Sequence, residues 1–331
     1  MDYVKEILNG NHLAAGRLIK LIEDEEPAGY AALKELFPHS GNAFIIGITG
    51  PPGAGKSTLI DRLVTEFRKG EKKVAVLAFD PSSPITGGAI LGDRIRMNRH
   101  CLDPGVFVRS IATRGALGGI SKAAKGALIV LDAMKYDLIL IETAGIGQIG
   151  ADICLLAQMT IVLCIPGMGD GLQAMKAGTL EVADLYIVNK ADMPGAQEVR
   201  NDLETMMNFR CTGEAARHPE VILISAARNQ GMDALLQAIW NFKADIKTDE
   251  RLSRKIREQE FLHLETIIKA LAADKIWEHV RHTEAFADAL AAVTRRETDP
   301  YSAAIAIVEA LMNVVSRFDV KKAARSEEII H

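Results

Sequence analysis

The chain has 331 residues, of which 48% are hydrophobic and 25% charged, the ordinary balance of a folded protein. Its formal net charge is −4, so we expect no nucleic-acid partner. No apolar run approaches the roughly 20 residues that cross a bilayer, and the N-terminus lacks a signal-peptide core, so we expect a cytoplasmic protein that binds no membrane.

Two patterns follow one another along the chain. Residues 1 to about 36 carry apolar side chains at helical spacing, and Pro38 with Gly41 ends that pattern. From residue 43, short apolar runs alternate with helical stretches, and such runs suit strands buried on both faces of a sheet. The seven runs are Phe44–Thr49, Lys73–Asp80, Val106–Ala112, Asp137–Thr143, Thr160–Pro166, Leu185–Asn189 and Val221–Ser225. Their alternation with helices predicts an α/β fold with a doubly wound, mainly parallel sheet.

Beyond about residue 232 the apolar pattern is helical again. Phe261, Leu264, Ile268 and Leu271 step by three and four residues, and Pro300 separates this stretch from a second one. We therefore expect an N-terminal helical extension over residues 1–40, an α/β domain over 41–245 and a C-terminal helical region over 246–331.

The strongest chemical motif is G-x-x-x-x-G-K-[S/T], which begins at Gly50, between a predicted strand and a predicted helix. Glycines let the loop backbone turn its N–H groups toward phosphates, at the positive end of the following helix. Lys56 would reach the β- and γ-phosphates, and the Ser57 hydroxyl would ligate Mg²⁺. The residues expected to contact the nucleotide here are Gly50, Pro52, Gly53, Ala54, Gly55, Lys56, Ser57 and Thr58. The motif predicts a P-loop NTPase.

A second motif, N-K-x-D, follows the strand predicted to end at Asn189. It comprises Asn189, Lys190 and Asp192. The Asp192 carboxylate can accept hydrogen bonds from guanine N1–H and the exocyclic amine, a donor pair that adenine lacks, so the base is predicted to be guanine. Ser225 and Ala226 fit the loop that supports this base through its backbone.

A third motif, Glu-Thr-Ala-Gly at residues 142–145, supplies an acid for Mg²⁺ and, at Gly145, an N–H for the γ-phosphate. Asp80 and Asp93 are further candidates for the metal ion or its waters. An aspartate at the end of a strand is more often a helix cap or turn former, so that interpretation stays open for both.

Five arginines, at positions 94, 96, 99, 109 and 114, could stabilise transition-state charge, and the sequence singles out none of them. The glycine-rich segment of residues 81–97 suits a switch loop ordered by the γ-phosphate.

At this point the chain resembles a known family, the methylmalonyl-CoA mutase-associated GTPases. Some members carry the older name arginine/ornithine (LAO/AO) transport system kinase. The resemblance runs from about residue 10 to about residue 240. It rests on Phe-Asp-Pro-Ser-Ser-Pro at residues 79–84, Gly-Gly-Ala-Ile-Leu-Gly-Asp-Arg-Ile-Arg-Met at 87–97, Thr-Arg-Gly-Ala-Leu-Gly-Gly at 113–119 and Glu-Thr-Ala-Gly-Ile-Gly-Gln at 142–148.

The resemblance implies a GTPase chaperone that gates cofactor loading of an adenosylcobalamin-dependent acyl-CoA mutase, or protects and reactivates it. It makes residues 41–245 the GTPase domain and 246–331 the dimerisation region of a homodimer. A cobalamin adenosyltransferase is a further partner in this scheme. The ligands would be GTP or GDP and Mg²⁺.

The resemblance also assigns residues. Lys56, Glu142 and Gln148 would be catalytic, and Ser57, Asp80, Asp93 and Glu142 would surround Mg²⁺. Residues 166–178 would form a third switch that couples the nucleotide to the mutase, with Asp170, Gln173 and Lys176 in it.

Five residues, in four places, depart from the family pattern. Ala144 replaces a valine, Ile149-Gly150 a Ser-Glu pair, Ala116 a histidine and Gly171 an acid. All lie in elements expected to sense the nucleotide or the partner, so they bear on hydrolysis rate and partner identity rather than on fold.

Two other functions are known for proteins with such motifs, and both stay open as alternatives. A nickel-delivery GTPase of metalloenzyme maturation would carry a Cys/His metal site; the four cysteines form no C-x-x-C pair and the histidines no ligand cluster. A transport-associated kinase would need a second substrate site, for which the sequence gives no signal.

Overall fold

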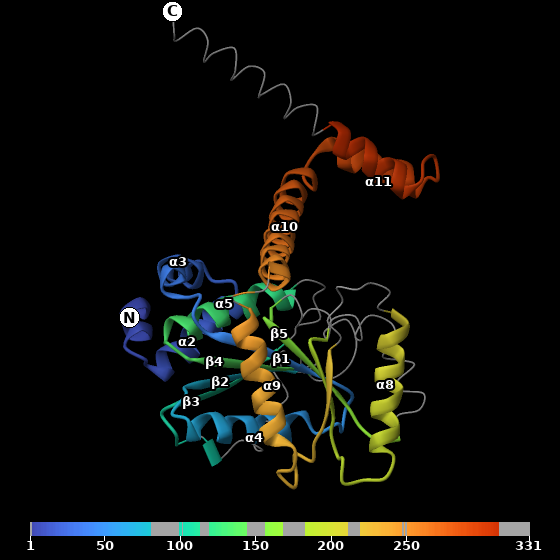
Figure 1. Cartoon of the computed structure of the whole chain (residues 1–331). Helices are drawn as coiled ribbons and strands as arrows, with labels where there is room; N and C mark the ends of the chain where they lie inside the picture. The colour runs from blue at the N-terminus through green and yellow to red at the C-terminus, as the bar shows by residue number, and fades with distance from the viewer. Residues whose placement is uncertain are drawn as a thin grey trace, which may run out of the picture. The chain divides into compact units, whose positions relative to one another are not determined.

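A seven-stranded sheet organises the chain (Figure 1), and every strand pair in it is parallel. Its order is β3-β2-β4-β1-β5-β6-β7. The strands are β1 (Phe44–Thr49), β2 (Val74–Asp80), β3 (Val106–Ala112), β4 (Leu138–Thr143), β5 (Met159–Cys164), β6 (Leu185–Val188) and β7 (Glu220–Leu223). All seven predicted strands are confirmed, each to within about two residues at either end.

The structure, a computed structural model, describes residues 2–80, 99–100, 102–112, 119–143, 156–167, 183–210, 219–246, 248 and 250–310. The helices within these ranges are α1 (Tyr3–Leu8), α2 (His12–Glu23), α3 (Pro27–Leu36), a 3₁₀ turn η1 (Phe37–His39), α4 (Lys56–Lys69), α5 (Gly119–Ala133), α8 (Ala196–Arg210), α9 (Met232–Asp245), α10 (Glu250–Val280) and α11 (Glu284–Thr294). Residues 300–310 are helical as well.

The strands are apolar throughout because helices cover both faces of the sheet. One face packs against α4 and α9, whose apolar side chains share a core with alternate residues of β1, β2, β4 and β5. The opposite face packs against α1, α2, α3 and α5 at one end of the sheet and against α8 at the other. The fold class is therefore the predicted doubly wound α/β sheet.

The N-terminal helices are tied to this sheet by polar contacts as well as by their apolar face. Asn11 caps α2, accepting hydrogen bonds from the amides of Leu13 and Ala14. Asp132 of α5 is buried and accepts hydrogen bonds from the amides of residues 41, 42 and 43 at the entry to β1. Three backbone donors are thus satisfied by one carboxylate where the helical extension meets the sheet.

The chain forms two compact units, Met1–His263 and Leu264–His331. The first turns of α10 belong to the first unit, where Lys255 pairs with Asp184 at 2.5 Å and the Gln259 amide donates to the Ala157 carbonyl. In the second unit Trp277 and Phe286 pack edge to face, with ring centroids 5.4 Å apart.

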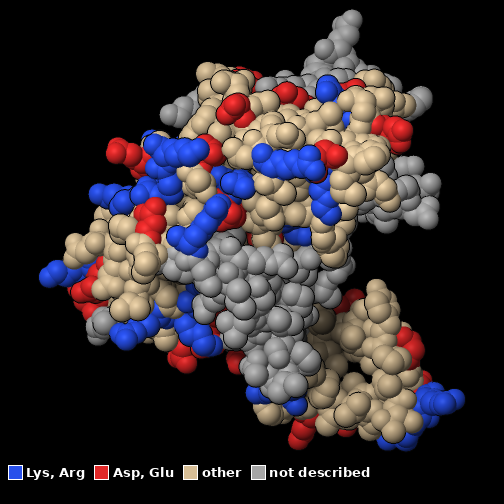
Figure 2. All heavy atoms as spheres, turned by 90° about the horizontal axis from the view of Figure 1, so that it is seen from below, with Lys and Arg blue, Asp and Glu red and all other residues tan. Residues whose placement is uncertain are grey.

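Charged side chains of both signs lie next to one another on the face of the molecule that Figure 2 shows. Arg68 of α4 pairs with Asp103 at 2.8 Å, and within the same helix Lys69 pairs with Glu66 at 2.7 Å.

Candidate nucleotide site

The turn between β1 and α4 requires glycine at both of its ends. A Cβ on Gly50 would lie 2.8 Å from the Leu163 carbonyl oxygen, and a Cβ on Gly55 would lie 2.4 Å from Nδ2 of Asn189. Gly55 also has a positive φ of 88°, which side chains other than glycine rarely adopt. The P-loop glycines therefore allow the backbone to approach β5 and the N-K-x-D loop closely.

Lys56 is buried at the start of α4 and points back along this loop. Its Nζ donates hydrogen bonds to the carbonyl oxygens of Gly50 and Pro51, at 2.9 and 3.1 Å. The ammonium group thus lies beside the P-loop, whose backbone amides are predicted to bind the phosphates.

Two of the predicted metal-site residues meet at the carboxyl edge of the sheet. The Ser57 hydroxyl donates a hydrogen bond of 2.8 Å to Oε1 of Glu142, and both side chains are buried. The register of the sheet explains this, since Ile48 near the end of β1 is paired with Glu142 on β4. Asp80 ends the neighbouring strand β2, whose Ala78 is also paired with Glu142, so its backbone lies at the same edge.

The Asn189 side chain joins all three predicted base and phosphate segments. Its Nδ2 donates to the Ala54 carbonyl of the P-loop at 2.7 Å, and its Oδ1 accepts from the Ala226 amide at 3.0 Å. Asn189 is buried, and Ala191 is bonded through its amide to the Ile224 carbonyl. The sequence motifs at 50–57, 189–192 and 225–226 are therefore brought together.

The Asp192 carboxylate lies beside the segment that begins at Ser225. The Ser225 hydroxyl next to it, and then the Arg228 guanidinium, whose Nε is 3.1 Å from Oδ2, hold the pKa of Asp192 below its usual value. An ionised carboxylate of this kind can accept hydrogen bonds from two donors.

Two arginines at this site were not predicted. Besides Arg228, Arg62 of α4 donates to the backbone carbonyls of Ala226 and Ala227. Arg228 could have been suspected from its place two residues after Ala226. Arg62 belongs to no motif, and its partners lie 164 and 165 residues further along the chain.

Two of the five arginines considered as catalytic candidates form hydrogen bonds with other elements of the fold. Arg109 on β3 donates to the Gly16 carbonyl and to the Glu23 carboxylate of α2, each at 2.6 Å. Arg99 binds the Asp61 carboxylate on α4 and the Thr65 hydroxyl. Both guanidinium groups are thus engaged within the fold, and Nε of Arg109 is buried without a hydrogen-bond partner among the described residues.

Several predicted site residues lie outside the described part of the chain. They are Asp93, Gly145, Gln148, Asp170, Gln173, Lys176 and arginines 94, 96 and 114, together with the side chain of Asp80. Of the loop at 166–178, Pro166 and Gly167 are described, and Gly167 has a φ of 81°.

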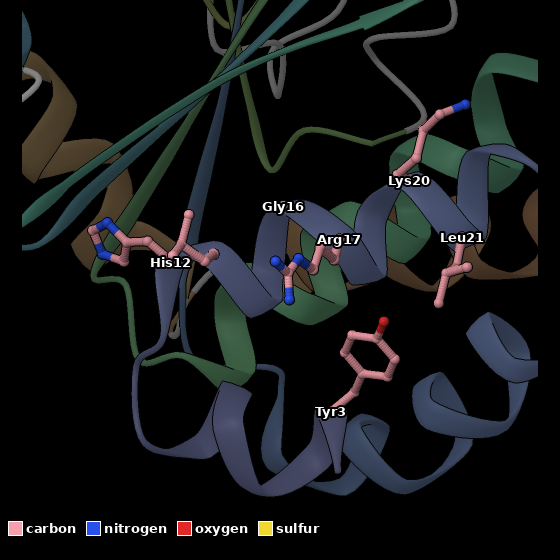
Figure 3. Close-up of a pocket in the computed structure, with 7 residues that line it drawn as sticks. Tyr3, His12, Gly16, Arg17, Lys20 and Leu21 are labelled. Atoms are coloured by element: carbon pink, nitrogen blue, oxygen red, sulfur yellow. The ribbon is translucent and has the colours of Figure 1, made fainter. Parts of the chain in front are cut away.

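A separate hollow of about 490 Å³ lies between α1 and α2 (Figure 3), lined in part by Tyr3, His12, Arg17 and Lys20. Lys20 pairs with Asp24 at 2.6 Å. None of the predicted nucleotide-site residues lines this hollow.

Within the described ranges, no group of three or more His, Cys, Asp or Glu side chains is arranged to hold a metal ion. Among the helices described, none combines the length and apolar character needed to cross a bilayer.

A parallel sheet whose first strand leads through a P-loop into a helix, with an N-K-x-D loop bonded to that P-loop, defines a P-loop GTPase. The chain belongs to the family described as methylmalonyl-CoA mutase-associated GTPase MeaB, whose family model matches residues 15–285. The resemblance inferred from the motifs is thereby confirmed.

Similar proteins agree with this family. A protein of Pyrococcus abyssi described as a putative GTPase is 40% identical over 313 residues, 94% of this chain and 96% of its own length. The mitochondrial methylmalonic aciduria type A homolog of Caenorhabditis briggsae is 32% identical over 246 residues, 73% of this chain and 59% of its own. A crystal structure of an LAO/AO transport system kinase shares the fold, with a TM-score of 0.70 and 24% identity over 94% of this chain and 96% of that one.

Proposed function

We propose that this GTPase binds GTP at the carboxyl edge of its sheet and uses its hydrolysis to act as a chaperone of an adenosylcobalamin-dependent acyl-CoA mutase. The observation that carries the nucleotide site is the double hydrogen bond of Asn189, to Ala54 and to Ala226. It unites the phosphate loop with the two segments suited to read guanine.

In this site each group has a role that follows from its position. Lys56 supplies a positive charge to the β- and γ-phosphates, which its reach along the P-loop permits. Asp192, kept ionised by its neighbours, accepts from the donor edge of guanine. Glu142 and Gln148 complete the catalytic set that the family motifs suggest.

The Ser57–Glu142 pair fits a magnesium ion, because it offers a hydroxyl and a carboxylate oxygen at one edge, and Mg²⁺ prefers oxygen ligands. Asp80 and Asp93 are the further ligands that we propose. When bound, Mg²⁺ would neutralise charge on the phosphates.

The mutase as partner is supported by the family's description and by the name of the nematode relative. We propose that residues 166–178, with Asp170, Gln173 and Lys176, transmit the nucleotide state to that partner. A cobalamin adenosyltransferase is a second partner under the same proposal.

We also propose a homodimer built through the helices after residue 250. Support comes from apolar side chains on α10 that the chain leaves exposed, among them Phe261, Leu264, Ile268 and Leu271. Faces of this kind mark interaction surfaces more often than free surface.

The test compares Lys56→Ala with Lys69→Ala, a matched change at an exposed lysine of the same helix. GTP hydrolysis is measured with and without an adenosylcobalamin-dependent methylmalonyl-CoA mutase. We expect hydrolysis to fall at least about a hundredfold in Lys56→Ala, a loss of the size seen when one stabilising group is removed, and to be unchanged in Lys69→Ala. The mutase should accelerate hydrolysis by the wild-type protein.

The two parts of the proposal fail separately. Normal hydrolysis by Lys56→Ala would refute the P-loop assignment. A wild-type rate that the mutase leaves unchanged would refute the chaperone role while leaving the site intact.

A further inference from the structure

The helix that follows the P-loop also holds the segment proposed to support the base. Arg62 lies six residues after Lys56 on α4, and the residue is partly buried. Nε donates to the Ala226 carbonyl oxygen at 3.1 Å, and Nη2 donates to the Ala227 carbonyl oxygen at 3.3 Å. One rigid helix therefore contacts both ends of the proposed nucleotide site.

The backbone of this segment forms a turn, because the Arg228 amide donates to the Ser225 carbonyl at 3.1 Å. Ala226 and Ala227 are its two central residues. The Ala226 amide is occupied by Asn189 Oδ1. The Ala227 amide, on an exposed residue, has no hydrogen-bond acceptor among the residues that the structure describes.

The Ala226 carbonyl and the Ala227 N–H belong to one peptide unit. In a planar trans peptide these two groups point in opposite directions, and none of the described peptide bonds is cis. When Arg62 holds the carbonyl, it fixes the plane and turns the N–H away from α4. A hydrogen bond from a charged donor also polarises the amide, which strengthens its N–H as a donor.

We propose that Arg62 is a positioning residue that sets guanine selectivity by orienting the Ala227 amide toward the base. This proposal rests on the nucleotide site proposed above. The turn lies beside Asp192, which Arg228 contacts from the same turn, so the amide and the carboxylate can address one base edge. Guanine and hypoxanthine present a carbonyl oxygen at position 6, which accepts from an N–H; adenine presents an amine there.

The experiment measures the affinities of GDP, IDP and ADP for the full chain by calorimetry, in wild type, Arg62→Ala and Arg62→Lys. Arg200→Ala serves as the matched control, because Arg200 on α8 pairs with Glu204 and is well exposed. Arg62→Ala should bind GDP and IDP about five- to tenfold more weakly, by the same factor, with ADP affinity unchanged. Arg62→Lys, which keeps a donor for one carbonyl, should lose about two- to threefold for GDP and IDP only.

The comparison is specific because GDP and IDP share a carbonyl oxygen at position 6 of the base, and ADP lacks it. An equal loss for all three nucleotides would mean that Arg62 merely stabilises the fold, and it would overturn the proposal, as would unchanged GDP affinity in Arg62→Ala. If Arg62→Ala fails to fold, Arg62→Lys decides by the same comparison. A wild-type protein that binds GDP and ADP equally would instead overturn the guanine site itself.

Discussion

At the scale of single residues, the loops of the proposed site are held to one another by side chains that bond to backbone groups. Asn189 satisfies a carbonyl of the P-loop and an amide of the loop after β7, and Arg62 satisfies two further carbonyls of that loop. Backbone groups are fixed in place by the chain, so such bonds set the geometry of loops that carry few apolar contacts of their own.

Replacing Asn189 by alanine should therefore disturb both the fold and the nucleotide affinity. Its two partners, on Ala54 and Ala226, are fully buried, and each would be left without its bond. We expect the free energy of unfolding to fall by about 2–3 kcal/mol, and GDP affinity to fall with it. Denaturant unfolding and GDP titration measure the two effects.

Asn201→Ala is the appropriate control, because Asn201 lies on the exposed side of α8 and its side chain, among the described residues, bonds within that helix. An Asn189→Ala protein that is as stable as this control would show that Asn189 does not hold the loops together.

At the scale of helices and strands, His12 at the start of α2 packs against Phe107 of β3 and against Tyr136, which precedes β4. Nε2 of His12 lies 2.8 Å from the Tyr136 hydroxyl, and the ring packs edge to face on Phe107 at 5.6 Å. Burial, and then the charge of Lys73, lowers the pKa of His12 from its ordinary 6.5. The folded state therefore binds a proton at this site less readily than the unfolded chain.

This sets the sign of a pH dependence. Between the ordinary value of 6.5 and the lower folded pKa, the unfolded chain carries more protons, so the free energy of unfolding falls as the pH drops through that window. We expect His12→Gln, which keeps a polar partner for Tyr136, to lose less stability than wild type between about pH 7.5 and about pH 5.5. Urea unfolding at the two pH values measures this. Parallel losses in both proteins would show that His12 is not buried in its neutral form.

The elements themselves were predictable because their patterns are local. Each strand is a short apolar run, and α4 buries the expected stripe of Leu59, Leu63 and Phe67. The P-loop and the N-K-x-D segment could be found for the same reason, since each is a contiguous motif at a strand end. Cys164 lies in one of these runs and is buried, and burial raises the pKa of its thiol to about 12.

Contacts between distant segments could not be predicted. The sequence gives Arg109 no preferred role among the five arginines. Its partners on α2 lie 86 and 93 residues away along the chain, so no local pattern connects them. Leu13 fits the helical spacing of its neighbours and yet is 76% exposed, whereas Leu18 is fully buried. A side chain is buried only where a neighbouring element packs over it. The spacing of apolar residues along one helix does not show how far its neighbours extend.

At the scale of the whole molecule, the two compact units differ in how much apolar surface they cover. The sheet unit encloses three apolar clusters, whereas α11 of the second unit has no buried residue. The described residues of the second unit thus bury little apolar surface. Such a unit would gain stability from association, since burying its apolar side chains against another surface removes them from water.

We expect this association to be a homodimer, and three substitutions in the full chain should weaken it. Leu264, Ile268 and Leu271 lie at spacings of four and three on α10 and are 57%, 56% and 51% exposed. Changing all three to glutamine leaves α10 helical in propensity but removes most of the apolar stripe. Light scattering should then report a dimer for wild type and a monomer for the variant, with GTP hydrolysis per chain retained.

The control changes Leu13, Phe37 and Leu102 to glutamine, because these exposed apolar side chains belong to the sheet unit. That protein should remain dimeric. A wild-type chain that is monomeric in light scattering would refute the dimer. The exposed apolar stripe on α10 would then be a candidate surface for a different partner.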